Sequence, residues 1–208
     1  MRGGDDRVQP FDLGRRDFFK LLGAGVVVIS VLRQAQAQES GHTARNGDSL
    51  PQEISAWLHI GENGTVTVYT GKVEVGQNIR TSLSQAVAEE LVMPVENIEL
   101  TMGDTQLTPF DMGTFGSRTT PTMNLQLRKV ASAARDLLID LAAAQWQTER
   151  KRLITAGGKV SDPARGISID YAALVKGKQL AATIPAEDPL IAPTGWKVLG
   201  KPLPKVDG

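Results

Sequence analysis

Two glycine-containing turns, each followed by apolar residues at helical spacing, constrain the fold of this chain most. The first turn is Val75-Gly76-Gln77-Asn78, and the second covers residues 113–119, Gly-Thr-Phe-Gly-Ser-Arg-Thr. A helix start leaves backbone N–H groups without partners inside the helix and carries a partial positive charge. A glycine turn at such a start can therefore bind a phosphate or another anion. The alternative is that both segments are ordinary loop-to-helix turns.

The segments after the two turns are predicted to be helices of unequal length. Residues 79–93 place apolar side chains at a spacing of three to four residues, and Pro94 ends this pattern. The second pattern starts at Thr120-Pro121 and continues to Trp146. Because Thr is a favoured N-cap and Pro a favoured first helical residue, we expect one long helix that begins there.

Alternating apolar and polar residues predict strands around the first helix. Residues 54–60 and 66–70 alternate, and Asn63-Gly64 between them predicts a β-hairpin whose turn residues both have positive φ. Residues 98–102 predict a further strand, and shorter strands are expected near residues 160, 167–169 and 180–184. We therefore expect an α+β fold, in which an N-terminal hairpin and a mixed sheet are packed by an amphipathic helix and one long helix.

The composition excludes several classes of function. Lys plus Arg and Asp plus Glu both number 23, and aromatic residues make up 5% of the chain, so nucleic acid is not an expected partner. The chain has no cysteine, which excludes a disulfide, a thiol nucleophile and an iron–sulfur cluster held by this chain. His42 and His59 are its only histidines, so we expect no metal site made of protein ligands.

The N-terminus has the pattern of a twin-arginine export signal. Arg15-Arg16 precede an apolar run at residues 21–32, and Ala35-Gln36-Ala37 follows it. The run is shorter than the roughly 20 residues that span a bilayer, which favours a cleaved signal over a membrane anchor. We expect a signal peptide at 1–37, a flexible linker at 38–52, a folded domain at 53–184, a proline-rich linker at 185–208, and a periplasmic location.

Glu89 and Glu90 are adjacent near the end of the first predicted helix. A functional interpretation would make them an acid/base pair. Neighbouring residues on a helix point about 100° apart, however. We therefore expect one solvated glutamate and one that is paired or caps a helix.

The order and spacing of five elements resemble the molybdopterin-binding large subunit of the xanthine oxidase family. The layout is similar to that of isoquinoline 1-oxidoreductase beta subunits and periplasmic aldehyde dehydrogenases. The five elements are residues 71–77, Thr81, residues 85–91, Gly103-Asp104-Thr105 and residues 113–119. The resemblance implies that this chain is the N-terminal part of an incomplete molybdopterin-binding domain.

The resemblance also implies a partial binding site for the molybdopterin cofactor, shared with domains downstream. Gln77 would contact the pterin between Gly76 and Asn78. The phosphate end would be lined by Gly116, Ser117, Arg118 and Thr119. Asn78 stands where the family usually has Gly, and Asn is the residue that best tolerates glycine-like backbone angles.

The activity that the resemblance implies is hydroxylation of an aldehyde or an N-heterocycle with water as the oxygen source. Electrons would pass to a small iron–sulfur subunit, and a cytochrome c is a further candidate acceptor. The family's catalytic glutamate has no counterpart here, so we expect no catalytic residue and no activity from this chain alone. The alternative is an exported, non-catalytic module that binds an anion or a partner protein through the same turns.

Overall fold

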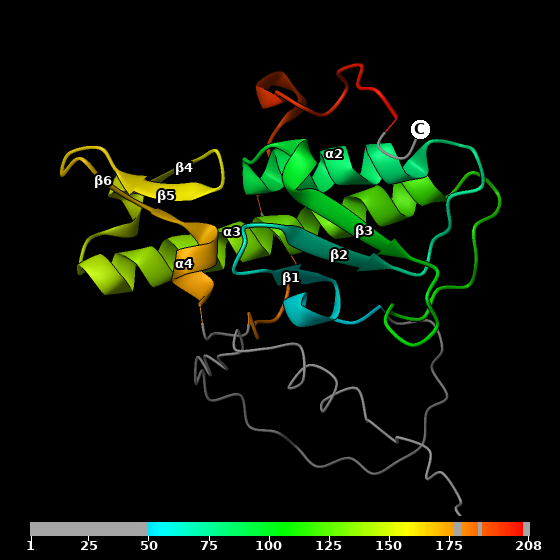
Figure 1. The fold of residues 1–208 in the computed structure, drawn as a ribbon, viewed down its shortest axis with the longest axis horizontal. Helices are drawn as coiled ribbons and strands as arrows, with labels where there is room; N and C mark the ends of the chain where they lie inside the picture. Colours follow the sequence, from blue (N-terminus) through cyan, green and yellow to red (C-terminus); the bar gives the residue numbers. More distant parts are fainter. Residues whose placement is uncertain (1–49, 177–179, 187–188, 206–208) are drawn as a thin grey trace, which may run out of the picture.

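Residues 50–176, 180–186 and 189–205 are described by the computed structural model. A small mixed sheet lies against two helices, and a second small sheet lies beside the far end of the longer helix (Figure 1). The expected mixture of helix and sheet is therefore confirmed. The predicted signal peptide, most of the predicted linker at 38–52 and His42 lie outside the described residues.

The first sheet contains strands β1 (Leu58–Ile60), β2 (Val66–Thr70) and β3 (Ile98–Met102). β1 pairs with β2 in antiparallel register, whereas β2 and β3 are parallel. Parallel neighbours need a crossover connection, and helix α2 (Ile79–Leu91) supplies it. The first turn, which connects β2 to α2, therefore lies at the carboxyl end of β2.

The hairpin differs from its prediction at its start and at its tip. Residues Ile54–Ala56 form a 3-10 turn instead of a strand, and the indole of Trp57 is fully buried and donates a hydrogen bond to the Pro51 carbonyl at 3.0 Å. At the tip only Gly64 has a positive φ, of 85°. The Asn63 side-chain oxygen instead accepts the Thr65 N–H at 3.0 Å, so its side chain closes the turn.

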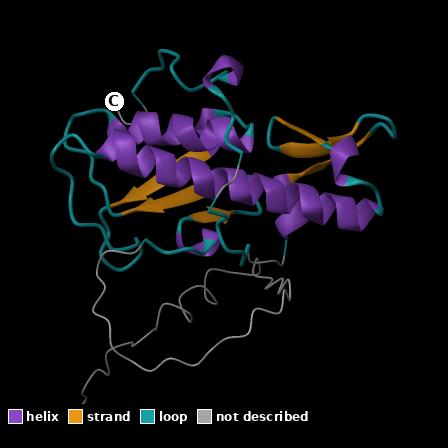
Figure 2. Cartoon of the chain, turned by 180° about the vertical axis from the view of Figure 1, so that it is seen from behind, coloured by secondary structure: helices purple, strands orange, loops and turns teal. Residues whose placement is uncertain are grey.

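The long helix α3 (Leu125–Trp146) starts later than predicted, because a π-helical turn (Thr119–Asn124) precedes it. The Thr122 N–H and hydroxyl both donate to the Arg118 carbonyl, and no side chain caps this turn, so the expected Thr120 cap is wrong. Viewed from behind, α2 and α3 lie side by side over one face of the first sheet (Figure 2). Their apolar faces and the sheet share one core.

The second sheet is antiparallel and follows α3. It contains β4 (Ile154–Ala156), β5 (Lys159–Asp162) and β6 (Ile167–Asp170), and the short helix α4 (Tyr171–Val175) follows. Gly157-Gly158 forms the β4–β5 turn, with φ of 57° and 74°. Among the described residues at 180–184, Thr183 makes only an isolated bridge to Glu53, not the expected strand.

The C-terminal segment, residues 189–205, runs along α2 on the side away from the first sheet (red in Figure 1). It contacts both adjacent glutamates of α2, Glu89 and Glu90, whose exposed fractions are 4% and 0%. The expectation that one of them is solvated is therefore wrong. Searching the described residues also shows no helix with the length and hydropathy needed to cross a membrane.

Candidate functional site

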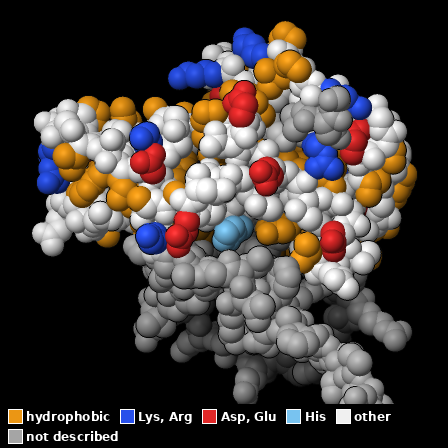
Figure 3. All heavy atoms as spheres, in the orientation of Figure 1, with side chains coloured by type: hydrophobic (Ala, Val, Ile, Leu, Met, Phe, Trp, Pro, Cys, Tyr) orange, Lys and Arg blue, Asp and Glu red, His pale blue; other side chains and the backbone are white. Residues whose placement is uncertain are grey.

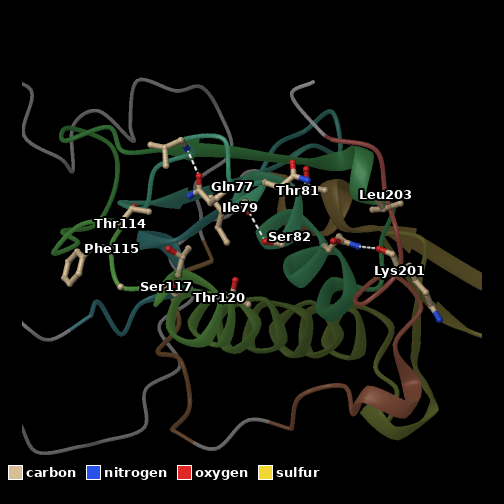
Figure 4. A pocket seen from close by; sticks show the side chains of 15 residues that line it. Gln77, Ile79, Thr81, Ser82, Thr114, Phe115, Ser117, Thr120, Lys201 and Leu203 are labelled. Atoms are coloured by element: carbon tan, nitrogen blue, oxygen red, sulfur yellow. Dashed lines mark hydrogen bonds between the residues drawn. The ribbon is translucent and has the colours of Figure 1, made fainter.

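The first and second turns border one cavity of about 610 Å³ (Figure 4). The N-terminal half of α2 and the C-terminal segment complete its walls. The residues that line it are Val75, Gln77, Asn78, Ile79, Thr81, Ser82, Gln85, Thr114, Phe115, Gly116, Ser117, Thr119, Thr120, Lys201 and Leu203. Two segments that are about forty residues apart in sequence therefore meet at a single site.

The structure brings most of the predicted site residues together. Gln77 and Asn78 line the cavity from one side, and Gly116, Ser117 and Thr119 line it from the other. Gly76 and Arg118 do not belong to this lining. Arg118 instead borders a second cavity, of about 270 Å³, together with Lys72 and Asp111. Cofactor contact by these residues stays a prediction.

The anion-binding site expected at the head of α2 already holds a carboxylate from the chain itself. Glu74 accepts the N–H groups of Gly76 at 2.8 Å, Asn78 at 3.1 Å and Arg80 at 3.0 Å. Partial burial raises the pKa of Glu74, but these three bonds and the charge of Lys205 outweigh it, so the pKa is lowered overall. Sequence reasoning missed Glu74, although an acidic residue shortly before a helix start is a known capping signal.

The backbone of the first turn depends on Asn78 and Gln77. Asn78 has a φ of 69°, which supports the expectation that Asn can replace Gly at this position. The Gln77 amide nitrogen donates to the Val73 carbonyl at 2.9 Å, and its oxygen accepts the Val75 N–H at 2.6 Å. One amide hydrogen and one oxygen lone pair remain for a ligand. Gln77 thus fixes the turn that it belongs to while it faces the cavity.

The second turn reverses the chain with consecutive positive φ angles. Gly116 has a φ of 62° and Ser117 a φ of 55°. A left-handed serine costs of order 1 kcal/mol, and such strain gathers at functional sites. The Ser117 hydroxyl makes no hydrogen bond to any other described residue, so this group in the cavity wall is available to a ligand.

Lys72 ties the two turns together. Lys72 is 7% exposed, and its ammonium group donates to the Asp111 carboxylate at 2.7 Å and to the Gly113 carbonyl at 2.6 Å. The Val73 N–H also donates to the Thr114 hydroxyl at 2.9 Å. The loop approaches so closely that a Cβ on Gly71 would lie 2.4 Å from the Asp111 Cβ. Sequence reasoning missed this connection, because no local pattern links residues 72 and 111.

The chemistry of the lining suits a polar or anionic ligand. Hydroxyl and amide side chains predominate, Lys201 is the one charged residue in the lining within the described part of the chain, and no carboxylate borders the cavity. The described residues also contain no group of three or more His, Cys, Asp or Glu side chains that could hold a metal ion. The site therefore fits a phosphorylated organic cofactor that carries its own metal, and it does not fit a metal bound directly by protein side chains.

The surface shown in Figure 3 carries interspersed charges of both signs, with hydrophobic side chains between them. Four large apolar side chains are exposed on the loops near the two cavities: Val75, Phe110, Met112 and Phe115. Their loops also carry the two turns. Apolar residues of this size gathered near a cavity are typical of a contact surface or a ligand entrance.

Comparisons with known proteins identify the family. The family model described as the molybdopterin cofactor-binding domain matches residues 14–202. A nicotinate dehydrogenase subunit from Pseudomonas putida is 32% identical over 156 residues, which are 75% of this chain and 13% of that protein. The gamma subunit of the 6-hydroxypseudooxynicotine dehydrogenase complex from Paenarthrobacter nicotinovorans is 38% identical over 54% of this chain and 14% of its own length.

Solved structures agree with this assignment. Quinoline 2-oxidoreductase from Pseudomonas putida 86 superimposes with a TM-score of 0.50 and 25% identity, over 57% of this chain and 15% of that one. The chain therefore spans about one seventh of the length of the relatives that it matches. From its sequence match and its fold, the chain belongs to the molybdopterin cofactor-binding domain family, among the large subunits of the xanthine oxidase family.

Proposed function

We propose that this chain forms part of the cofactor-binding site of a molybdenum hydroxylase that oxidises an N-heterocycle or an aldehyde. The observation that carries the proposal is the single cavity between the first and second turns, whose lining includes five of the seven residues that the family resemblance assigns to the pterin and its phosphate. The named relatives act on nicotinate and 6-hydroxypseudooxynicotine, and an aldehyde oxidoreductase subunit from Escherichia coli is also similar. These names support the substrate class.

The role of this chain is to bind and orient the cofactor. Gln77 and the Ser117 and Thr119 hydroxyls supply hydrogen bonds, and the backbone of the second turn supplies N–H groups at the head of the π-helical turn. When bound, the cofactor supplies the metal and the redox chemistry. Because these 208 residues contain no cysteine, iron–sulfur clusters for electron transfer would be held by protein outside them.

The remaining parts of the proposal concern partners and location. The rest of the molybdopterin-binding subunit would close the cavity, a small iron–sulfur subunit would accept electrons, and a cytochrome c would be a further acceptor. Water would be the oxygen source. The Arg15-Arg16 motif and the apolar run after it support export to the periplasm by the twin-arginine route.

The test is cofactor content in the complex that contains this chain. Gln77→Ala and Ser117→Ala should each lower molybdenum and pterin per polypeptide by several-fold, since each removes a polar group from the cavity wall. Gln106→Ala and Ser168→Ala are matched controls, because both residues are exposed and outside the lining. If both cavity variants keep wild-type molybdenum and pterin contents, the proposal is wrong and the exported binding module becomes the better hypothesis.

A further inference from the structure

One wall of the cavity comes from the C-terminal segment, far from both turns in sequence. Lys201 and Leu203 line the cavity beside the N-terminal half of α2 (Figure 4). Residues 196–203 carry no helix or strand of their own. Their position therefore depends on contacts with side chains of α2 and α3.

Glu89 of α2 holds this wall through main-chain hydrogen bonds. Its carboxylate accepts the N–H groups of Lys197 at 2.9 Å, Val198 at 2.6 Å and Leu199 at 2.9 Å. Three consecutive backbone donors thus converge on one carboxylate in a residue that is only 4% exposed. Hydrogen bonds to a charged acceptor are about twice as strong as neutral ones, and these donors would have no other described partner without it.

Gln85 connects the same segment to the cavity. It lies one helical turn before Glu89, so both side chains are on one face of α2. Its amide nitrogen donates to the Val198 and Lys201 carbonyls, both at 2.9 Å, and Gln85 itself lines the cavity. The position of the wall and the shape of the cavity are therefore fixed by neighbouring residues of one helix.

A second anchor precedes the wall. Ile191 donates its N–H to Glu90 at 3.1 Å, and its carbonyl accepts the Arg128 guanidinium at 2.7 Å and the Trp196 indole at 3.0 Å. This anchor fixes where the wall begins. It does not reach residues 197–203, so their hydrogen bonds to α2 come from Glu89 and Gln85, beside the packing of Val198 against the core.

We propose that residues 196–203 are a wall of the cofactor cavity and that Glu89 is the positioning residue that keeps this wall closed on the cofactor. This inference rests on the proposed function. It assigns a role in cofactor retention to a glutamate that does not itself line the cavity. Glu89→Gln removes the negative charge and offers an NH₂ group to backbone donors, so the attachment of the wall to α2 is weakened while the Gln85 hydrogen bonds remain.

The test compares Glu89→Gln with Glu96→Gln, a matched control whose side chain is exposed, in the cofactor-loaded complex. Trypsin cleavage after Lys197 reports the position of the wall, and the rate of molybdenum and pterin loss on dilution reports retention. We expect Glu89→Gln to accelerate both by about tenfold, a change that corresponds to one strong hydrogen bond. Leu203→Ala should accelerate cofactor loss with unchanged cleavage after Lys197, because it shortens the wall without releasing it.

The outcomes separate this inference from the proposed function. Faster cleavage with unchanged cofactor loss in Glu89→Gln, while Gln77→Ala still lowers cofactor content, would overturn the role of the wall and leave the cofactor site in place. Unchanged cleavage in Glu89→Gln would overturn the role of Glu89. The unfolding midpoint of the cofactor-free complex shows whether Glu89→Gln acts through a general loss of folding. If faster cofactor loss is accompanied by a matching fall in this midpoint, the result also counts against a positioning role for Glu89.

Discussion

Replacing Glu90 should destabilise this chain more than replacing any exposed glutamate. Its side chain is fully buried and accepts the Arg128 Nε at 2.9 Å and Nη2 at 2.6 Å, the Arg135 Nη1 at 3.3 Å, and the Ile191 N–H. Both arginine side chains are nearly buried, at 12% and 11% exposure. Glu90→Gln preserves the volume of the side chain but leaves two guanidinium groups without their shared counter-charge. Breaking a buried ion pair in this way costs about 3–5 kcal/mol.

The assay is urea unfolding of the purified chain, followed by tryptophan fluorescence. Trp196 contributes a local signal beside those of Trp57 and Trp146, because Arg128 lies over its ring at 5.3 Å from the centroid. Glu62→Gln is the control, since Glu62 is exposed. The double variant Glu90→Gln/Arg128→Met should recover part of the lost free energy of unfolding, because one uncompensated charge is removed. A loss below about 1 kcal/mol for Glu90→Gln, the value of an exposed ion pair, would refute the reasoning.

Three further perturbations test the turns. Gly71→Ala should lower the free energy of unfolding by about 1–3 kcal/mol, because the new Cβ would meet the Asp111 Cβ at 2.4 Å; Gly195→Ala, whose new Cβ meets only the Ile191 Cγ2 at 3.3 Å, should cost less in the same urea titration. Glu74 has a lowered pKa, so its contribution to stability is present above its ordinary pKa of 4.5 and is lost as the pH falls below it. The stability difference between wild type and Glu74→Gln should therefore shrink as the pH falls through and below 4.5, and a constant difference in urea midpoints would contradict the role of this carboxylate. Arg118→Ala should lower molybdenum content less than Ser117→Ala does, because Arg118 borders the second cavity; equal losses by metal analysis would show that Arg118 reaches the cofactor.

The secondary structure was predictable where the apolar spacing extended over many residues or where a strand lay between clear turn residues. The apolar spacing located α2 and α3, and β3 lies at the predicted residues. The errors occurred at ends, where tertiary contacts override local preference. Val92 ends α2 in a left-handed conformation before Pro94 is reached, and a π-helical turn replaces the expected cap of the long helix. β4 was missed because its three residues are too few to show a periodic pattern.

The candidate site was predictable as a pair of turns but not as a set of contacts. Because each turn precedes a helix, the sequence indicated that Gln77 and Ser117 lie at helix starts, and the structure places both on one cavity. The partners of Lys72, Glu89 and Glu90 lie 38 to 110 residues away, and no periodicity encodes such distances. Burial of these charged groups became apparent only with the tertiary structure.

The Glu89 carboxylate contacts residues 197–199 through their backbone N–H groups and not through their side chains. Although Val198 also packs against the hydrophobic core, the hydrogen bonds themselves tolerate every amino acid at these three positions except one. Proline lacks the amide hydrogen that the carboxylate needs, so it is the substitution that natural selection and protein engineers alike should avoid there.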